Sequence, residues 1–119
     1  MGSIAHSAVT DEVPDDMALY IKHRMLIALT GCGHSGVENI VEYGFQVTGL
    51  SRLYAIIGGL HFMGLNEDRI RQVTNYLVNK SPSTVVGGTH CTGILGIAAL
   101  YNAVPKAFRL GGVGSVIEL

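Results

Sequence analysis

The most constraining feature of this 119-residue sequence is a pattern that occurs three times along the chain. Each copy consists of a short apolar segment, a Gly-x-x-His tetrapeptide, a further glycine and a stretch with helical periodicity. The histidines of the three copies, His34, His61 and His90, recur at intervals of 27 and 29 residues, which is about the length of one strand–helix–strand unit. Such units predict an α/β fold in which consecutive strands are parallel neighbours joined by right-handed crossovers.

The apolar segments are nearly continuous rather than alternating, which is typical of strands that are covered on both faces. Residues 17–22 and 25–30 are expected to form a hairpin, because only His23 and Arg24 separate them. Asn66 is expected to cap the second helix, since two acidic residues follow it. The predicted strands are 17–22, 25–30, 53–57, 84–86 and 113–119, and the predicted helices are 37–47, 66–79 and 94–104.

The position of the three Gly-x-x-His turns has a geometric consequence. Turns that follow neighbouring parallel strands lie at the same edge of the sheet, where open α/β sheets bind their ligands. The glycines allow positive φ angles and close approach of a ligand. We therefore expect His34, His61 and His90 to face one crevice.

The three histidines are suited to binding a metal ion. Neutral imidazole is the commonest protein ligand for zinc and also suits iron, copper and nickel, and three protein ligands leave an open position, as in catalytic sites. The alternative is that each histidine makes a hydrogen bond within its turn. The neighbouring helix N-termini disfavour a bare cation and favour an anion, so a hydroxide-bridged metal or a phosphate-bearing substrate would suit the site better.

Two cysteines and two aspartates lie close to these turns in the sequence or in the expected fold. Cys32 and Cys91 each lie within two residues of a histidine. A thiolate near a helix N-terminus has a lowered pKa and can bind metal or react; the alternative is a small buried apolar residue. Asp15 and Asp16 precede the first strand of the hairpin, where they could form a turn or direct a carboxylate to a metal.

Composition excludes several classes of function. The net charge of −1 gives no electrostatic basis for binding nucleic acid or an anionic membrane. The longest apolar stretches are shorter than the roughly 20 residues that span a bilayer, and the N-terminus does not read as a signal peptide. Two cysteines do not make a disulfide framework, so we expect a cytoplasmic location. Charged residues make up only 14% of the chain, which indicates an unusually apolar surface.

Four segments, in their order and spacing, resemble one branch of the metallo-β-lactamase superfamily, that of the dihydropterin-ribofuranosylaminobenzene phosphate synthases. The resemblance covers approximately residues 15–119. The segments are 15–21 (DDMALYI), 29–36 (LTGCGHSG), 57–61 (IGGLH) and 88–93 (GTHCTG).

The resemblance implies an αββα sandwich with a metal site, usually occupied by zinc, iron or manganese. In this superfamily most metal ligands belong to an HxHxDH motif in the first half of the domain, and this sequence contains no such motif. The resemblance therefore implies that residues 15–119 form a C-terminal half-domain with one mostly parallel or mixed sheet. Residues 1–14 are then expected to be an irregular segment or a cloning remnant.

The resemblance also implies roles for individual residues. His90 would be the histidine that binds the metal from the later part of the sequence. His34 or Cys32 would replace the aspartate that bridges the metals in most members. His61 would lie beside the pocket as a ligand, proton donor or phosphate contact, and we take it as the candidate catalytic residue. With His34, His90 and Cys32 as the candidate ligands, a divalent metal, zinc above all, would be bound weakly, and the site could be empty.

Two functions are compatible with these observations. The first is the C-terminal part of a metal-dependent hydrolase or transferase that acts on a small phosphate- or ester-bearing substrate and is inactive until an HxHxDH-bearing half completes it. The second is a non-catalytic binding protein that retains the half-fold. In both cases the apolar inner face of the sheet predicts self-association or a complementary N-terminal half as partner.

Overall fold

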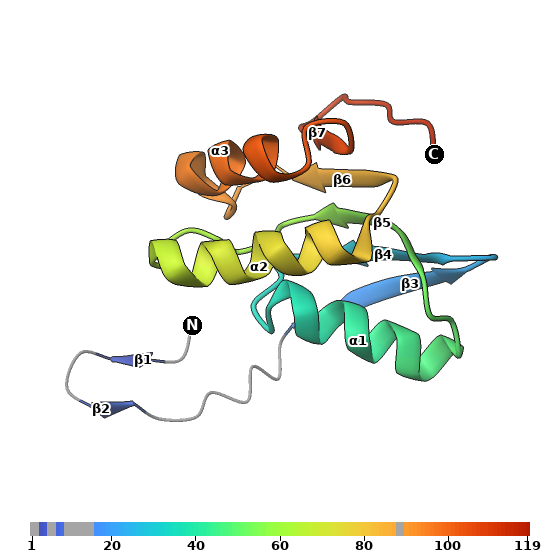
Figure 1. Ribbon diagram of the computed structural model, residues 1–119, viewed down its shortest axis with the longest axis horizontal. Coiled ribbons are helices and arrows are strands. Elements are labelled where there is room, and N and C mark those ends of the chain that lie inside the picture. Colours follow the sequence, from blue (N-terminus) through green and yellow to red (C-terminus); the bar gives the residue numbers. More distant parts are fainter. Residues whose placement is uncertain (1–2, 5–6, 9–15, 88–89) are drawn as a thin grey trace.

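The computed structural model describes residues 3–4, 7–8, 16–87 and 90–119. It confirms the α/β class: three helices pack on a mixed, five-stranded sheet (Figure 1). A separate pair of short antiparallel strands lies in the N-terminal segment that was expected to be irregular. The strands are β1 (Ser3–Ile4), β2 (Ser7–Ala8), β3 (Ala18–Lys22), β4 (Leu26–Thr30), β5 (Leu53–Gly58), β6 (Thr84–Gly87) and β7 (Phe108–Leu110), and the helices are α1 (Val37–Thr48), α2 (Glu67–Lys80) and α3 (Gly93–Ala103).

The strands of the larger sheet follow one another in space in the order β3-β4-β5-β6-β7. The expected hairpin is confirmed, because β3 and β4 are antiparallel with Ala18 opposite Thr30. The expected parallel neighbours are also confirmed, since β4, β5 and β6 pair in parallel with one helix between each pair. The expected cap of the second helix is confirmed as well: the side chain of Asn66 accepts a hydrogen bond of 2.8 Å from the backbone N–H of Arg69.

The prediction of a final strand at 113–119 is wrong. The last strand is β7, which pairs in parallel with β6 soon after α3 ends. Phe108 of this strand is 7% exposed, whereas Val113 and Val116 are almost fully exposed. Burial of the aromatic ring therefore favours pairing at β7, and the glycines between 111 and 114 disfavour a strand in the segment that follows.

One face of the sheet is buried beneath the helices. A row of paired residues crosses all five strands on this face: Tyr20, Ala28, Ile56, Val85 and Phe108. All five belong to the hydrophobic core or pack directly against it, which places the core between the sheet and the helices. From the helices, the core receives Val37, Val41, Ile70, Val73, Leu77 and Leu100.

The opposite face carries a second row, apolar except at β7, and is not covered by any of the described helices. This row, which we call the open face, runs through Leu19, Leu29, Ile57, Val86 and Arg109. Leu19 is 64% exposed, whereas Val86 is only 3% exposed and lines a cavity together with residues of the C-terminal segment. The open face is thus apolar at its centre and unpacked towards β3.

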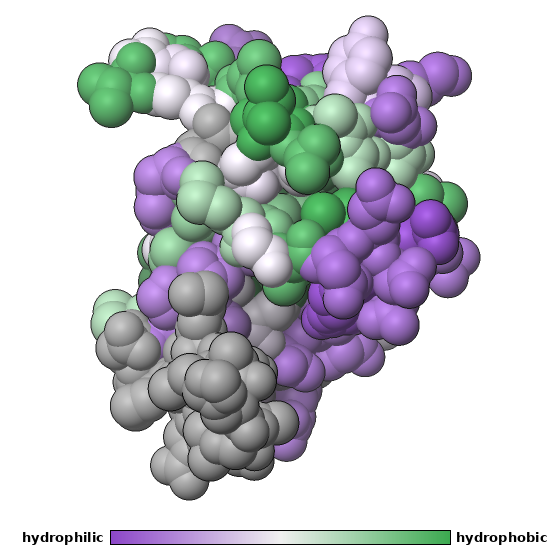
Figure 2. All heavy atoms as spheres, turned by 90° about the vertical axis from the view of Figure 1, so that its left-hand side faces the viewer, coloured by the Kyte–Doolittle hydropathy of each residue, from purple (hydrophilic) through white to green (hydrophobic). Residues whose placement is uncertain are grey.

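Exposed apolar side chains also occur on the helical side of the molecule. Helix α3 contains no charged residue, and its Ile94 and Leu95 are 81% and 70% exposed. In Figure 2 apolar side chains gather in the upper part of the view, at the level where Figure 1 places α3. The low charged fraction of the sequence is therefore visible at the surface. Among the described helices, none is both long and apolar enough to cross a membrane.

Helices α1 and α2 are joined by a bidentate ion pair whose contribution to stability should depend on pH. Arg69 Nη1 and Nη2 donate to Glu38 Oε2 and Oε1 at 2.7 and 2.9 Å. Burial alone would raise the pKa of Glu38, but the hydrogen bonds from Arg69 outweigh it and hold the pKa below its ordinary value. A lowered pKa in the folded state stabilises the protein above the ordinary glutamate pKa, and this stabilisation is lost as the pH falls through the lowered value.

We therefore expect Glu38→Gln to lower the free energy of unfolding by about 1 kcal/mol at pH 7, and by much less near pH 3. Urea denaturation at both pH values measures the difference. Glu118→Gln, at an exposed position in the C-terminal segment, should change stability by less than about 0.5 kcal/mol at either pH. An equal loss for Glu38→Gln at both pH values would contradict an electrostatic contribution from this pair.

Candidate functional site

The turns that follow β4, β5 and β6 meet at one edge of the sheet, as the repeated pattern predicts. The first two turns are joined by a hydrogen bond of 3.0 Å from Gly59 N–H to Gly31 O, and by one of 2.7 Å from Thr30 Oγ1 to Gly59 O. The segment after the second turn is joined to the third by a bond of 3.0 Å from Met63 N–H to Cys91 O. The third turn includes residues 88 and 89, which lie outside the described residues.

Two of the three histidines are in direct contact. The ring centroids of His34 and His61 lie 4.6 Å apart in an edge-to-face arrangement, and both side chains are half-buried. The loop that carries His34 is held by Asp16, whose carboxylate accepts hydrogen bonds from His34 N–H at 3.1 Å and Ser35 N–H at 2.8 Å. Burial opposes the charge on Asp16, but these hydrogen bonds hold its pKa below the ordinary value. Asp16 therefore fixes the loop as an anion; Asp15 lies outside the described residues.

His61 combines three properties that are typical of functional residues. Its φ angle is +50°, which is uncommon for a residue other than glycine and indicates local strain. Its Nε2 atom is buried without a hydrogen-bond partner among the described residues. Burial, followed by the nearby charge of His34, lowers the pKa of its imidazole. His61 is therefore neutral at physiological pH, with one buried nitrogen unpaired.

Both cysteines lie beside His61. Cys32 Sγ lies 3.5 Å from His61 Nδ1, and Cys91 Sγ accepts the backbone N–H of His61 at 3.3 Å. Cys91 Sγ also donates to Cys32 O at 3.0 Å. The possible ligand atoms of Cys32, His61 and Cys91 all lie within 4.8 Å of one another, and Cys91 is the one residue of this cluster that was not among the predicted site residues.

The prediction of a lowered thiol pKa is wrong for Cys32. Burial, together with the hydrogen bond and charge of Cys91 and the charge of Asp16, raises the pKa of Cys32 to about 11. Helix α1 begins five residues further along, at Val37, and the effect of a helix terminus falls off within about one turn. Cys32 is therefore not a thiolate nucleophile at neutral pH in the protein as described.

His90 lies apart from the contact between the other two histidines. Its side chain is exposed and lines a cavity of about 670 Å³ with Ile57, Gly58 and Val86 on one side and residues 111–117 of the C-terminal segment on the other. Among the described contacts, none joins His90 directly to His34. Its charge does contribute to the lowered pKa of His61, which places it within electrostatic range of the cluster.

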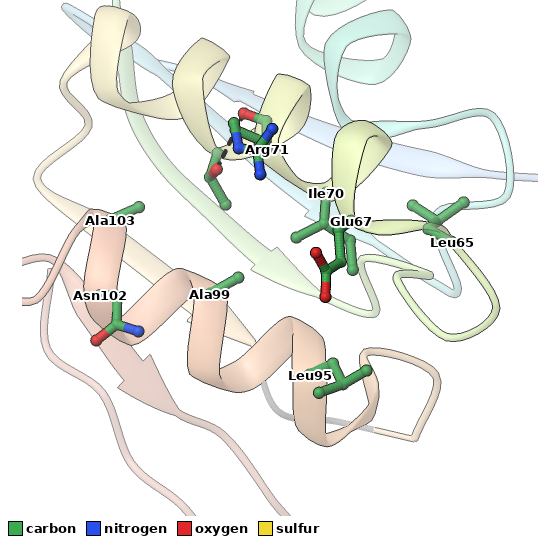
Figure 3. A pocket seen from close by; sticks show the side chains of 9 residues that line it. Leu65, Glu67, Ile70, Arg71, Leu95, Ala99, Asn102 and Ala103 are labelled. Carbon is green, nitrogen blue, oxygen red and sulfur yellow. Dashed lines mark hydrogen bonds between the residues drawn. The ribbon is translucent and has the colours of Figure 1, made fainter.

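A second cavity, of about 430 Å³, lies between α2 and α3 (Figure 3). Glu67 and Arg71 lie beside apolar side chains there, among them Ile70, Leu95 and Ala99. Its lining includes neither histidine nor cysteine. This groove therefore lacks the imidazole and thiol groups that occur at the sheet edge with His34 and His61.

Sequence comparison places these features in a known context, although no family model matches the chain. The sequence is 37% identical over 111 residues to the uncharacterized protein MJ0448 of Methanocaldococcus jannaschii, an alignment that covers 93% of this chain and 40% of that protein. It is 33% identical over 111 residues to 7,8-dihydropterin-6-methyl-4-(beta-D-ribofuranosyl)-aminobenzene-5'-phosphate synthase of the same organism, covering 92% of this chain and 37% of the synthase. The chain thus spans about two fifths of the length of these relatives.

Structural comparison finds a solved protein with a similar fold. The fold matches the crystal structure of Tm1679, a metal-dependent hydrolase of the β-lactamase superfamily, with a TM-score of 0.71 and 25% sequence identity. The match covers 81% of this chain and 37% of the hydrolase. In sequence this chain is thus similar to the synthase named above, and in fold it is similar to a metal-dependent hydrolase of the β-lactamase superfamily.

Proposed function

We propose that this chain is the C-terminal part of a metal-dependent hydrolase or transferase, and that it supplies one edge of the active site. The observation that carries the proposal is the buried, unpaired Nε2 of His61 beside the ring of His34, at the edge where the parallel strands end. A buried polar atom without a partner costs about 1–3 kcal/mol. Such atoms in native proteins usually find a partner in the working state, and at this edge that partner would be a ligand.

The residues at this edge fit a divalent metal. His34 and His90 offer imidazole nitrogens to such an ion, and His61 lies against the ring of His34. Imidazole ligands favour zinc, with iron or manganese as alternatives. A bound divalent ion supplies Lewis-acid polarisation of an ester or phosphoryl oxygen.

The residues of this chain would divide the remaining tasks. Asp16 holds the loop of His34 in place and so preorganises that imidazole. His61, with its unpaired Nε2, is placed to hold a proton at that atom and to deliver it to a leaving group. The cavity beside His90 has the volume of a small-molecule pocket. Its position, and the similarity to a phosphate synthase, support a small phosphate- or ester-bearing substrate.

The partner in this proposal is a second sheet that packs on the open face. Leu19 and Ile21 of β3 are 64% and 45% exposed there, next to the apolar side chains of β4 and β5. Burying several hundred Å² of such surface gives a driving force of the order of 10 kcal/mol before the costs of association. An HxHxDH-bearing N-terminal half would supply this sheet together with the missing ligands, and a second copy of the chain would cover the face alone.

The proposal is tested by measuring hydrolysis of phosphodiester and ester substrates with zinc, iron or manganese present. We expect negligible turnover from the 119-residue chain, and turnover after an HxHxDH-bearing N-terminal half of a relative is added. In that assembly His34→Ala should lower kcat by at least about 100-fold, whereas His23→Ala at the hairpin turn should have no effect. Inactivity of a correctly assembled complex would contradict the hydrolase and favour a non-catalytic binding protein.

Sedimentation equilibrium tests the partner separately. The chain alone should sediment as a species heavier than 12.6 kDa at micromolar concentration, and the complementary half should replace the self-association. A monomer that binds no dye specific for exposed apolar surface would contradict the proposed packing on the open face.

A further inference from the structure

The two cysteines beside His61 are not explained by the hydrolase site described above. That site uses Nε2 of His61 and the neighbouring ring of His34. Nδ1 of His61 faces Cys32 Sγ instead, and Cys91 Sγ lies within 4.8 Å of Cys32 Sγ and of a ring nitrogen of His61. We propose that Cys32, Cys91 and His61 Nδ1 form a separate binding site for a soft divalent cation, with zinc as the best match.

The distances fit a single ion held by the three side chains. Zinc binds sulfur at about 2.3 Å and nitrogen at about 2.0 Å, so tetrahedral geometry separates a sulfur and a nitrogen ligand by about 3.5 Å and two sulfurs by about 3.8 Å. Cys32 Sγ and His61 Nδ1 are already 3.5 Å apart. The 4.8 Å limit on the other separations means that binding requires side-chain shifts of about 1 Å or less.

The backbone around the cluster is shaped to bring these atoms together. Gly59 lies against the cluster, and a Cβ atom there would be 2.8 Å from Cys91 Sγ and 2.9 Å from Cys32 Cα. His61 is held at a positive φ angle, which directs its ring from the end of β5 towards the neighbouring turn. Strain of this kind persists where the surrounding structure requires it and is concentrated at functional sites.

The surroundings of the sulfur atoms are also those of a metal–thiolate site. The backbone N–H of His61 points at Cys91 Sγ at 3.3 Å, and such a donor stabilises a sulfur that carries negative charge. Two thiolates and a dication sum to zero charge, which suits a cluster in which Cys91 is 8% exposed. Cys32 is only half-buried, which leaves a side of the cluster from which an ion can enter.

The proposal has a consequence for His61 itself. An ion bound at Nδ1 requires the proton of the neutral ring to lie on Nε2. Nε2 is the atom that is buried without a partner. The soft-metal site would therefore select the tautomer in which His61 presents a donor to the neighbouring hydrolase site, although its existence does not depend on that function.

Cobalt titration of the metal-free chain, kept reduced and free of oxygen, tests the proposal without any measurement of turnover. We expect one equivalent of Co²⁺ to produce a near-ultraviolet thiolate-to-cobalt charge-transfer band, which zinc then abolishes by displacing cobalt. Cys32→Ser and Cys91→Ser should each weaken the band and lower cobalt affinity by at least about tenfold. His34→Ala, which alters the hydrolase site but not the three ligands, should retain the band.

Several results would overturn the proposal: a folded wild-type chain that shows no thiolate band, a band that survives in both cysteine variants, or a band that is lost in His34→Ala and retained in Cys91→Ser. Because Cys91 is buried, its variant could fail to fold. Cadmium NMR of the wild-type chain then decides, since two sulfur ligands shift the cadmium resonance far from the position given by nitrogen and oxygen alone. Failure of the hydrolase assay leaves these spectra unchanged, so the two proposals are tested independently.

Discussion

Replacing Gly58 with alanine is expected to lower the free energy of unfolding by more than about 3 kcal/mol, or to prevent folding. Gly58 ends β5 with a φ angle of +128°, a conformation that side-chain-bearing residues rarely adopt. A Cβ atom at this position would lie 2.2 Å from the backbone oxygen of Thr30 and 2.5 Å from its Oγ1. The clash is with the paired strand β4, so neither partner can move without breaking the sheet at the edge that carries the site.

Gly49→Ala is the matched control for this experiment. Gly49 also has a positive φ angle, +76°, but a Cβ atom there would have no neighbour within 4 Å. The cost should be the backbone strain alone, about 1 kcal/mol. Urea denaturation followed by far-ultraviolet circular dichroism measures both variants. Equal losses of unfolding free energy in the two variants would show that the close approach of β5 to β4 at Gly58 does not contribute to stability.

Phe62→Ala is expected to destabilise the chain by about 3–5 kcal/mol. Phe62 follows His61 directly, is 2% exposed and belongs to the core. Its ring packs against Gly96 of α3, where a Cβ atom would lie 2.7 Å from Phe62 Cβ. Phe62 therefore anchors the turn of His61 to a helix from the next unit of the repeat. Its loss leaves a cavity and frees that turn.

The same truncation at Phe45, in α1, provides the comparison. Phe45 is only partly buried at the border of the core, so Phe45→Ala should cost no more than about 2 kcal/mol. The midpoint and slope of urea denaturation give both values. A loss at Phe62 no larger than that at Phe45 would show that the contact with α3 is not a main source of stability.

The larger features of the fold were predictable because they depend on local periodicity. Apolar runs and Gly-x-x-His turns indicated the parallel strands, and the sequence around Asn66 indicated a helix start that its side chain does cap. The last strand was not predictable in this way, because residues 113–119 are as apolar as a strand. The choice of 108–110 depends on the burial of Phe108 against the core, which is a tertiary effect.

In the candidate site, too, the features set by topology were predictable and those set by tertiary contacts were not. The repeat correctly predicted that turns from three units meet at one edge, since this follows from topology. It did not indicate that Cys91 and Cys32 gather beside His61, because that arrangement depends on the positive φ angle of His61 and on the absence of a side chain at Gly59. Nor did it indicate the raised pKa of Cys32, because burial and the neighbouring Cys91 and Asp16 cause it.

The order of the strands in the sheet has a consequence for how the chain folds. Because β3, β4, β5, β6 and β7 are neighbours in space in the same order as in sequence, each pairing closes a loop no longer than one helix and its turns. Low sequence separation of contacts favours rapid folding, and each unit can add to the preceding one as the ribosome releases it. The contacts of Cys91 with Cys32 and His61 then form only once the turn after β6 is in place, so the cluster reports that β4, β5 and β6 have assembled.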